Sequence, residues 1–99
     1  MSIYRTASFQ VRTESMERCK ERIRRYVADI KQYEPGTRVY VSLQDQVNPS
    51  HFVHFYAFDD EAAEAAHGSS EITRSFSQFL GPELAGPVSF GDYGVIAET

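Results

Sequence analysis

Residues 51–58 form a run of apolar and aromatic side chains that leaves a strand no face suited to water. Alternate side chains of a strand point to opposite sides of a sheet. One face would therefore carry Phe52, His54, Tyr56 and Phe58, and the other Val53, Phe55 and Ala57. Because a chain of 99 residues has room for one small core, its own helices can cover only one of these faces. We expect a second copy of the chain to cover the other face in a twofold homodimer.

Hydrophobic periodicity predicts the elements on either side of this strand. The first is a strand at 3–12, followed by an amphipathic helix that begins at an N-cap, Thr13, and ends at a turn at 34–37. Strands at 38–46 and 51–58 come next. A helix at 61–67 then breaks at Gly68 and restarts at 69 or 70, and a last strand runs from about 88 to 97. The order β-α-β-β-α-β is that of a ferredoxin-like fold. We therefore predict a single α+β domain over 1–99, with both helices on one face of a four-stranded antiparallel sheet.

Charge and composition argue against several classes of partner. The net charge is −4 and the isoelectric point is about 5.3, whereas a nucleic-acid-binding domain normally has a basic excess. The five basic residues in 18–25 have Glu21 among them and Glu17 just before them, which is typical of a solvated helix face. No apolar run is long enough to span a membrane, and 1–5 does not resemble a secretory signal. With one cysteine, Cys19, the chain suits a reducing compartment, and we expect a cytoplasmic protein without nucleic-acid or membrane partners.

The sequence offers no convergent metal ligands and no cofactor motif. His51 and His54 are three positions apart on a strand and point to opposite faces. Glu64 and His67 share a helix face, but a single Glu-x-x-His pair is half of what a carboxylate di-iron site requires. Phosphate-binding loops, dinucleotide fingerprints and nucleophile elbows do not occur, and Cys19 lies on the apolar stripe of its helix. We therefore predict a protein that binds no metal and no cofactor.

A cluster of aromatic and imidazole side chains remains as the candidate site. Tyr40, His54 and Tyr56 lie on the two hairpin strands, and His67 ends the short helix. These groups could line a pocket for a flat aromatic ligand and exchange protons with it. We take His67, Tyr40 and His54 as candidate catalytic residues, and Tyr56, Phe58 and Phe76 as candidate substrate contacts. The same residues also suit a core or an interface with satisfied hydrogen bonds, and the sequence leaves both interpretations open.

Several motifs together resemble the antibiotic biosynthesis monooxygenase family. They are Glu34-Pro35-Gly36-Thr37 followed by Tyr40, Phe52-Val53-His54-Phe55, Asp60-Glu61-Ala62-Ala63 leading to His67, Phe76-Ser77-Gln78-Phe79-Leu80, and Gly86-Pro87-Val88. The resemblance extends from the first strand to the end of the chain. It implies a dimeric α+β barrel in which each subunit holds its own pocket between sheet and helices. Characterised members include oxygenases without cofactors that convert phenols or quinols into quinones.

The resemblance also bears on individual residues. His67 matches the family's recurring histidine, and Tyr40 matches its recurring strand tyrosine. Where many members carry Glu and, two residues later, Trp, this chain has Tyr56 and Phe58. The chain contains no Trp, and the haem-degrading branch depends on one, so haem degradation is disfavoured.

Three functions follow as hypotheses. The first is a cofactor-independent monooxygenase that oxidises a quinol or polycyclic phenol with O₂. The second is a non-catalytic homodimeric module that binds a small aromatic molecule. The third is an isomerase-like pocket enzyme on the same scaffold.

Overall fold

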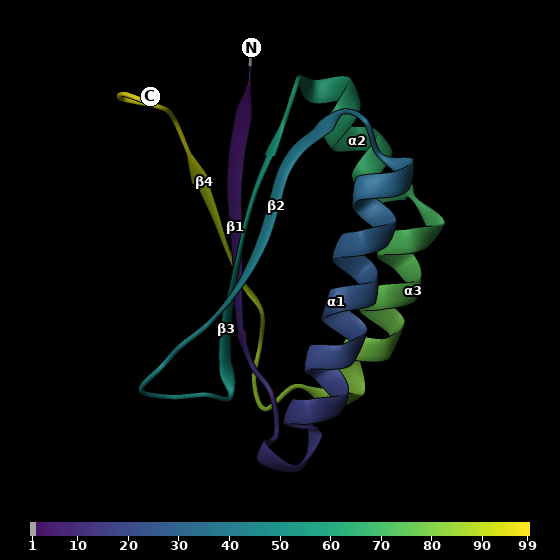
Figure 1. Ribbon diagram of the computed structural model, residues 1–99, viewed down its shortest axis with the longest axis vertical. Helices are drawn as coiled ribbons and strands as arrows, with labels where there is room; N and C mark the ends of the chain where they lie inside the picture. Colours follow the sequence, from purple (N-terminus) through teal and green to yellow (C-terminus); the bar gives the residue numbers. More distant parts are fainter. Residues whose placement is uncertain (1) are drawn as a thin grey trace.

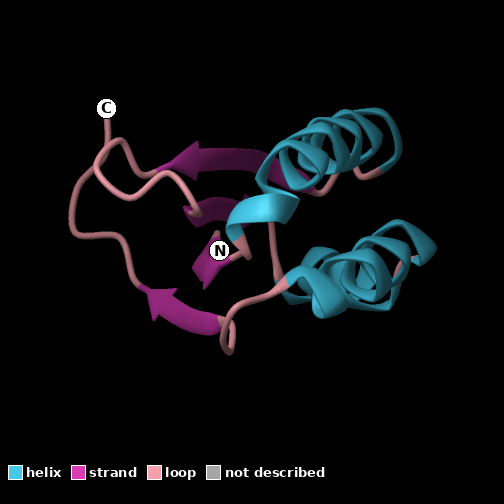
Figure 2. Cartoon of the chain, turned by 90° about the horizontal axis from the view of Figure 1, so that it is seen from below, coloured by secondary structure: helices cyan, strands magenta, loops and turns pink. Residues whose placement is uncertain are grey.

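The computed structural model describes residues 2–99 as one sheet covered by helices on one side (Figure 1). In chain order the elements are β1 (Ile3–Gln10), α1 (Met16–Tyr33), β2 (Thr37–Gln44), β3 (His51–Phe58), α2 (Glu61–Ser69), α3 (Glu71–Leu80) and β4 (Ser89–Tyr93), with short 3₁₀ turns at Thr13–Ser15 and Gly81–Glu83. The four strands pair antiparallel in the order β2-β3-β1-β4. Seen from below, all helices lie on the same side of the strands (Figure 2). The α+β class and the ferredoxin-like order are confirmed.

Strand register decides which side chains of β3 face the helices. Ala7 of β1 lies opposite His54, and Tyr40 of β2 lies opposite Tyr56. Residues opposite one another share a face of the sheet. These side chains therefore point towards the helices, where His54 is 1% exposed.

The core between sheet and helices follows from the apolar stripe of α1. Cys19, Ile23, Tyr26 and Ile30 recur at helical spacing and are all buried. They pack with Phe9, Val11, Phe52, Phe76 and Leu80. Burying one large apolar side chain stabilises a fold by about 1.5–3 kcal/mol, so this stripe holds α1 on the sheet. The helix ends at Tyr33, before Pro35, because a residue preceding proline disfavours helical geometry.

The first helix begins later than the sequence predicts. Val11 forms a bridge with Leu84, and the backbone N–H of Arg12 donates to the carbonyl of Glu83 at 3.0 Å. These contacts keep the chain extended through Arg12. Thr13 then lies in a 3₁₀ turn instead of capping a helix, and α1 starts at Met16. The predicted N-cap was wrong because the pairing with 83–84 is a tertiary contact.

The break between the two later helices falls after the predicted Gly68, whereas the restart at Ser70 is as predicted. Gly68 stays helical and α2 continues to Ser69. Ser70 is extended, and its side chain accepts a hydrogen bond from the backbone N–H of Thr73 as the N-cap of α3. Serine satisfies free backbone donors at a helix start, which glycine has no side chain to do. The break therefore falls at Ser70.

The last strand is shorter than predicted. It ends at Tyr93, which pairs with Tyr4 near the start of β1. Since β1 begins at Ile3, a longer β4 would soon run out of partners in this sheet. Residues 94–98 instead contribute to a shallow depression beside Tyr4 and Phe55, and the Tyr4 hydroxyl donates to Glu98 at 2.7 Å.

The face of the sheet opposite the helices is largely apolar and open in the single chain. It carries Val41 and Leu43, which are 41% and 52% exposed, together with the partly exposed Val53 and Phe55. The two-sided apolar character of β3 is therefore real. Coverage of this face by a second copy stays a prediction.

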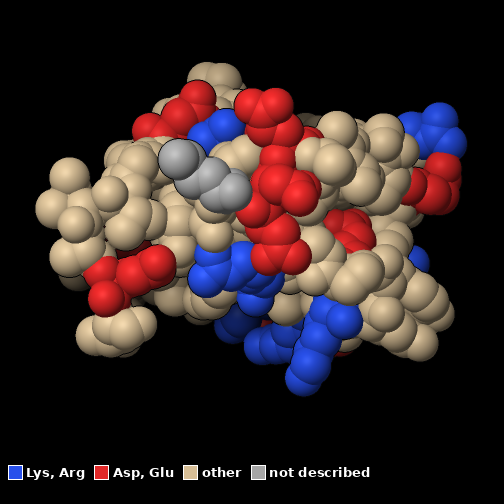
Figure 3. Space-filling view, turned by 90° about the horizontal axis from the view of Figure 1, so that it is seen from above, with Lys and Arg blue, Asp and Glu red and all other residues tan. Residues whose placement is uncertain are grey.

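Charged side chains on the surface are mixed in sign. At the end of the molecule where α2 lies, acidic and basic groups lie beside one another (Figure 3). Along α1, Lys20 pairs with Glu17 at 3.3 Å and Arg24 with Glu21 at 3.1 Å. The basic residues of 18–25 thus include a solvated, salt-bridged helix face. Within residues 2–99, no helix combines the length and hydrophobicity needed to cross a membrane.

Candidate functional site

A cavity of about 270 Å³ lies between the sheet and the helices α1 and α3. Its walls include five of the six residues that the sequence singles out: Tyr40, His54, Tyr56, His67 and Phe76. Phe58 is outside this lining and only 1% exposed, and its ring lies 5.2 Å from the His67 ring, centroid to centroid. Phe58 thus packs against the His67 ring, outside the cavity lining, and does not contact a ligand in the cavity.

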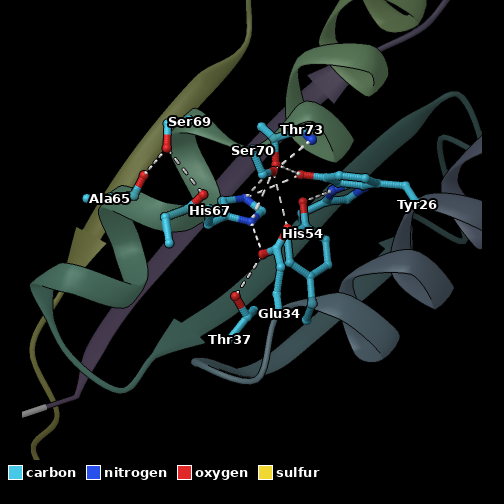
Figure 4. Close-up of polar contacts among 11 residues, drawn as sticks. Tyr26, Glu34, Thr37, His54, Ala65, His67, Ser69, Ser70 and Thr73 are labelled. Carbon is cyan, nitrogen blue, oxygen red and sulfur yellow. Dashed lines mark hydrogen bonds and ion pairs between the residues drawn. The ribbon is translucent and has the colours of Figure 1, made fainter.

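His67 is held by the carboxylate of Glu34. The histidine Nδ1 lies 2.7 Å from Glu34 Oε1, and both side chains are 10% exposed (Figure 4). Thr37 donates its hydroxyl to Oε1 at 3.0 Å, and Ser70 donates to Oε2 at 3.3 Å. An ionised carboxylate only accepts hydrogen bonds, so with Glu34 in that form Nδ1 of His67 carries the hydrogen. The second nitrogen, Nε2, is then left with a lone pair in the neutral imidazole.

Tyr26 of α1 lies on the Nε2 side of His67. The two groups are 3.3 Å apart, and the Tyr26 hydroxyl is also 3.1 Å from Thr73 Oγ1 (Figure 4). Its ring stacks on Phe76 with centroids 4.1 Å apart, which fixes its position. Burial raises the pKa of Tyr26, so this phenol stays protonated and can donate to Nε2.

Tyr40 and His54 form a second buried pair. The Tyr40 hydroxyl is 2.8 Å from His54 Nδ1. Burial raises the pKa of Tyr40, so the phenol keeps its hydrogen and donates it to Nδ1. Burial lowers the pKa of His54 to about 4, so the imidazole is neutral near pH 7. His67, whose Nδ1 donates to the Glu34 carboxylate and whose Nε2 faces Tyr26, is therefore better placed than His54 to accept a proton from a ligand.

The remaining polar groups do not assemble a metal site within residues 2–99. The Glu64 carboxylate pairs with Arg5 at 2.9 Å, while His67 binds Glu34, so the Glu-x-x-His pair is engaged with two separate partners. Among the described residues, no three His, Cys, Asp or Glu side chains converge as metal ligands. Cys19 is fully buried in the core, and burial raises the pKa of its thiol.

The model for antibiotic biosynthesis monooxygenases matches residues 2–78, which is most of the chain. The chain belongs to this family. A solved structure from Nitrosomonas europaea, assigned by name to these monooxygenases, superposes with a TM-score of 0.90 at 23% identity and covers 99% of this chain and 93% of its own. One from Caulobacter crescentus gives 0.91 at 18% identity, with coverage of 97% and 91%. No curated protein matches the chain.

Two residues of this member of the antibiotic biosynthesis monooxygenase family were not singled out as functional by the sequence reasoning. Glu34 was assigned to a turn and Tyr26 to the apolar stripe of a helix. A tyrosine in such a stripe offered a signal, because its buried hydroxyl needs a partner. For Glu34 the signal was its place in the Glu-Pro-Gly motif of the family resemblance, which does not indicate its partner His67, 33 positions away in the chain.

A groove of about 380 Å³ lies on the other side of His67. It runs between the start of β2 and the helices α2 and α3, and Glu34, Gly36, Ala63, His67 and Ser70 contribute to its walls. His67 thus lines both the inner cavity and this outer groove. Within this monooxygenase-family chain, the imidazole separates the two spaces.

Proposed function

We propose that this chain is a cofactor-independent monooxygenase that oxidises a small quinol or phenol with O₂. The observation that carries the proposal is the hydrogen bond between His67 and Glu34 at the wall of an aromatic cavity. This bond keeps Nδ1 on the carboxylate side, so Nε2, on the side of the cavity residue Tyr26, is the nitrogen that would take a phenolic proton. Membership of the monooxygenase family supports the same reaction class.

The chemistry is one that protein side chains can assist by binding, desolvation and proton transfer. His67 takes the phenolic proton, and the electron-rich anion passes one electron to O₂. The resulting radical pair combines to a peroxide at a ring carbon, and loss of water leaves a quinone. One oxygen atom of O₂ becomes the new carbonyl oxygen and the other leaves as water, so phenol plus O₂ gives quinone plus water. By the same step, a quinol plus O₂ gives a hydroxyquinone plus water.

The cavity walls suit a flat, uncharged ring. Tyr40 and Tyr56 stack on one another with centroids 5.0 Å apart, and Phe76 and Tyr26 form a second stacked pair. Both pairs contribute to the lining. A volume of about 270 Å³ lies near the lower end of ordinary ligand pockets, which favours a small ligand.

Oxygen uptake with a panel of hydroquinones and naphthols tests the proposal. We expect O₂ consumption and quinone formation in equal amounts, unchanged by dialysis against a metal chelator. Heat-denatured protein is the control for autoxidation of the substrates. Uptake no faster than this control across the panel, or uptake abolished by the chelator, would contradict the proposal.

A non-catalytic binding module is the second candidate. It is favoured by the fact that both nitrogens of His67 already have protein partners, Glu34 and Tyr26. Under this alternative, aromatic ligands bind with saturation in a fluorescence or calorimetric titration while O₂ uptake stays at the level of the denatured control.

A further inference from the structure

Among the described residues, His67 is the one that lines both the inner cavity and the outer groove. Its Nε2 is 3.3 Å from the Tyr26 hydroxyl, and Tyr26 lines the inner cavity but not the outer groove. Its Nδ1 is 2.7 Å from Glu34, which lines the outer groove but not the cavity. The two nitrogens of one imidazole thus have partners in different spaces.

An imidazole with partners on both nitrogens can move a proton without moving itself. A proton taken up at Nε2 makes the ring a cation with hydrogen on both nitrogens. Release of the Nδ1 hydrogen then returns a neutral ring, and a proton has passed from one side to the other. This requires an acceptor at Nδ1 that can in turn reach solvent.

Glu34 meets this requirement. Thr37 and Ser70 donate to its carboxylate and orient it towards Nδ1. Its side chain also borders a second depression, beside Lys31 and Arg38. Other titratable groups of the inner cavity suit proton storage less well. Burial raises the pKa values of Tyr26, Tyr40 and Tyr56 and lowers that of His54.

We propose that Glu34 is the outlet of a proton path that runs from the inner cavity through His67 to the outer groove. The assignment of a phenolic ligand rests on the proposed function, but the path itself does not require the oxygen chemistry. Glu34 is then a positioning residue, which acts on the ligand only through His67.

The path can be followed with 4-nitrophenol, an electron-poor phenol whose anion absorbs visible light and which resists oxidation by O₂. Mixed with the wild-type protein in a stopped-flow instrument, it should give a fast rise of anion absorbance as His67 takes its proton. Glu34→Ala should slow this rise by at least about tenfold, because one acid–base group is worth roughly 10²–10⁴-fold and water replaces it in part. Added formate or acetate should enter the space left in the groove and restore the rate in proportion to its concentration.

Two further variants distinguish the loss of a proton acceptor at Glu34 from a change in the shape of the groove. Glu34→Gln can still accept the Nδ1 hydrogen bond but cannot store a proton, and its side chain blocks added carboxylate, so the rise should be slow and not rescued. Glu71→Ala removes a carboxylate that lines the same groove but is exposed and paired with Arg74. This variant should match the wild type and show no response to formate.

A second measurement, which needs no ligand, determines which nitrogen of His67 carries the hydrogen. Two-bond ¹H–¹⁵N spectra distinguish protonated from unprotonated imidazole nitrogens, and the wild type and Glu34→Gln should both show His67 protonated at Nδ1. An unprotonated Nδ1 in the neutral wild-type ring would overturn the proposal. So would a Glu34→Ala rate equal to that of the wild type, or a slow rate that added carboxylate fails to restore. A working path in a protein without quinol oxidation would leave this proposal standing and contradict only the proposed function.

Discussion

Gly36 and Ala63 bring the turn before β2 into direct contact with α2. A β-carbon placed on Gly36 would lie 2.6 Å from the β-carbon of Ala63, closer than two such atoms approach in proteins. The backbone N–H of Asp59 also donates to the Gly36 carbonyl at 2.9 Å. Glu34 lies two residues before Gly36, and His67 lies one helical turn after Ala63. The close contact therefore sets the separation at which His67 meets Glu34.

Gly36→Ala should destabilise the fold by about 1–3 kcal/mol, the usual cost of forcing an extra methyl into a packed contact. Urea unfolding monitored by circular dichroism measures the change. Gly81→Ala is the matched control, because a β-carbon there meets no atom within 4 Å, and its stability should stay close to that of the wild type. In the double variant Gly36→Ala with Ala63→Gly, the loss should be smaller than the sum of the two single losses. Additive losses would show that the two residues do not contact each other.

Substitution of His67 should affect turnover and stability together. The alanine-rich helix alone suggests that His67→Ala is well tolerated, but the buried bond to Glu34 changes that expectation. Loss of this partner should cost about 1–3 kcal/mol, because the carboxylate stays buried with one donor fewer. Turnover of a quinol substrate should fall roughly 10²–10⁴-fold. Both quantities should be measured on the same preparation, and full turnover per folded molecule would show that His67 is not the base.

His54 should make the folded state sensitive to mild acid. Its pKa is lowered to about 4 by burial, whereas an unfolded histidine titrates near 6.5. Between these values the unfolded chain binds more protons, so stability should fall as the pH drops below 6.5 and should level off below about 4. The loss is on the order of 3 kcal/mol, because the two pKa values differ by about 2.5 and each unit of difference is worth 1.36 kcal/mol.

His54→Gln is the control for this pH effect, because glutamine does not titrate and can still accept from Tyr40. The difference in unfolding free energy between wild type and variant should change by the stated amount between pH 7 and pH 4. Carboxylates titrate in both proteins and cancel in the difference. A constant difference across this range would show that His54 is not buried in its neutral form.

The open apolar face should bring two copies of the chain together. Light scattering at micromolar concentration should give about twice the chain mass of 11.2 kDa. Val41→Lys places a charge on this face and should shift the protein towards the monomer. Val47→Lys is the control, since Val47 is 94% exposed in the turn after β2 and away from the strands that form this face. A wild-type monomer, or equal effects of the two substitutions, would place any interface elsewhere.

The main elements of this fold could be predicted because they follow from local geometry. Side chains that share a face recur every two residues along β3 and every three to four residues along α1. The prediction that Tyr40, His54 and Tyr56 share one face of the sheet required only this alternation and the pairing of the two strands in a hairpin. That both faces of β3 are apolar could be predicted from the residue types of 51–58 alone.

The sequence-based predictions were wrong where the preference of neighbouring residues is overridden by contacts between distant parts of the chain. Thr13 and Gly68 are plausible places for a helix to start or break when only their neighbours are considered. Pairing of the chain with 83–84 delayed the first helix, and the Ser70 cap moved the break. Phe58 shares a face with His54, but its place at the end of β3 puts it behind the His67 ring instead of beside the cavity.

The sequence by itself determined the family, the order of elements and the face on which the candidate residues lie. Tertiary structure alone decided which of these residues form a site. His67 meets Glu34 across 33 positions and Tyr26 across 41, and neither distance corresponds to a helix or strand period. Such a pairing depends on how closely α2 rests on the turn before β2, which the Gly36–Ala63 contact sets in three dimensions. Periodicity places a side chain on a face, and only packing between elements places it within 2.7 Å of its partner.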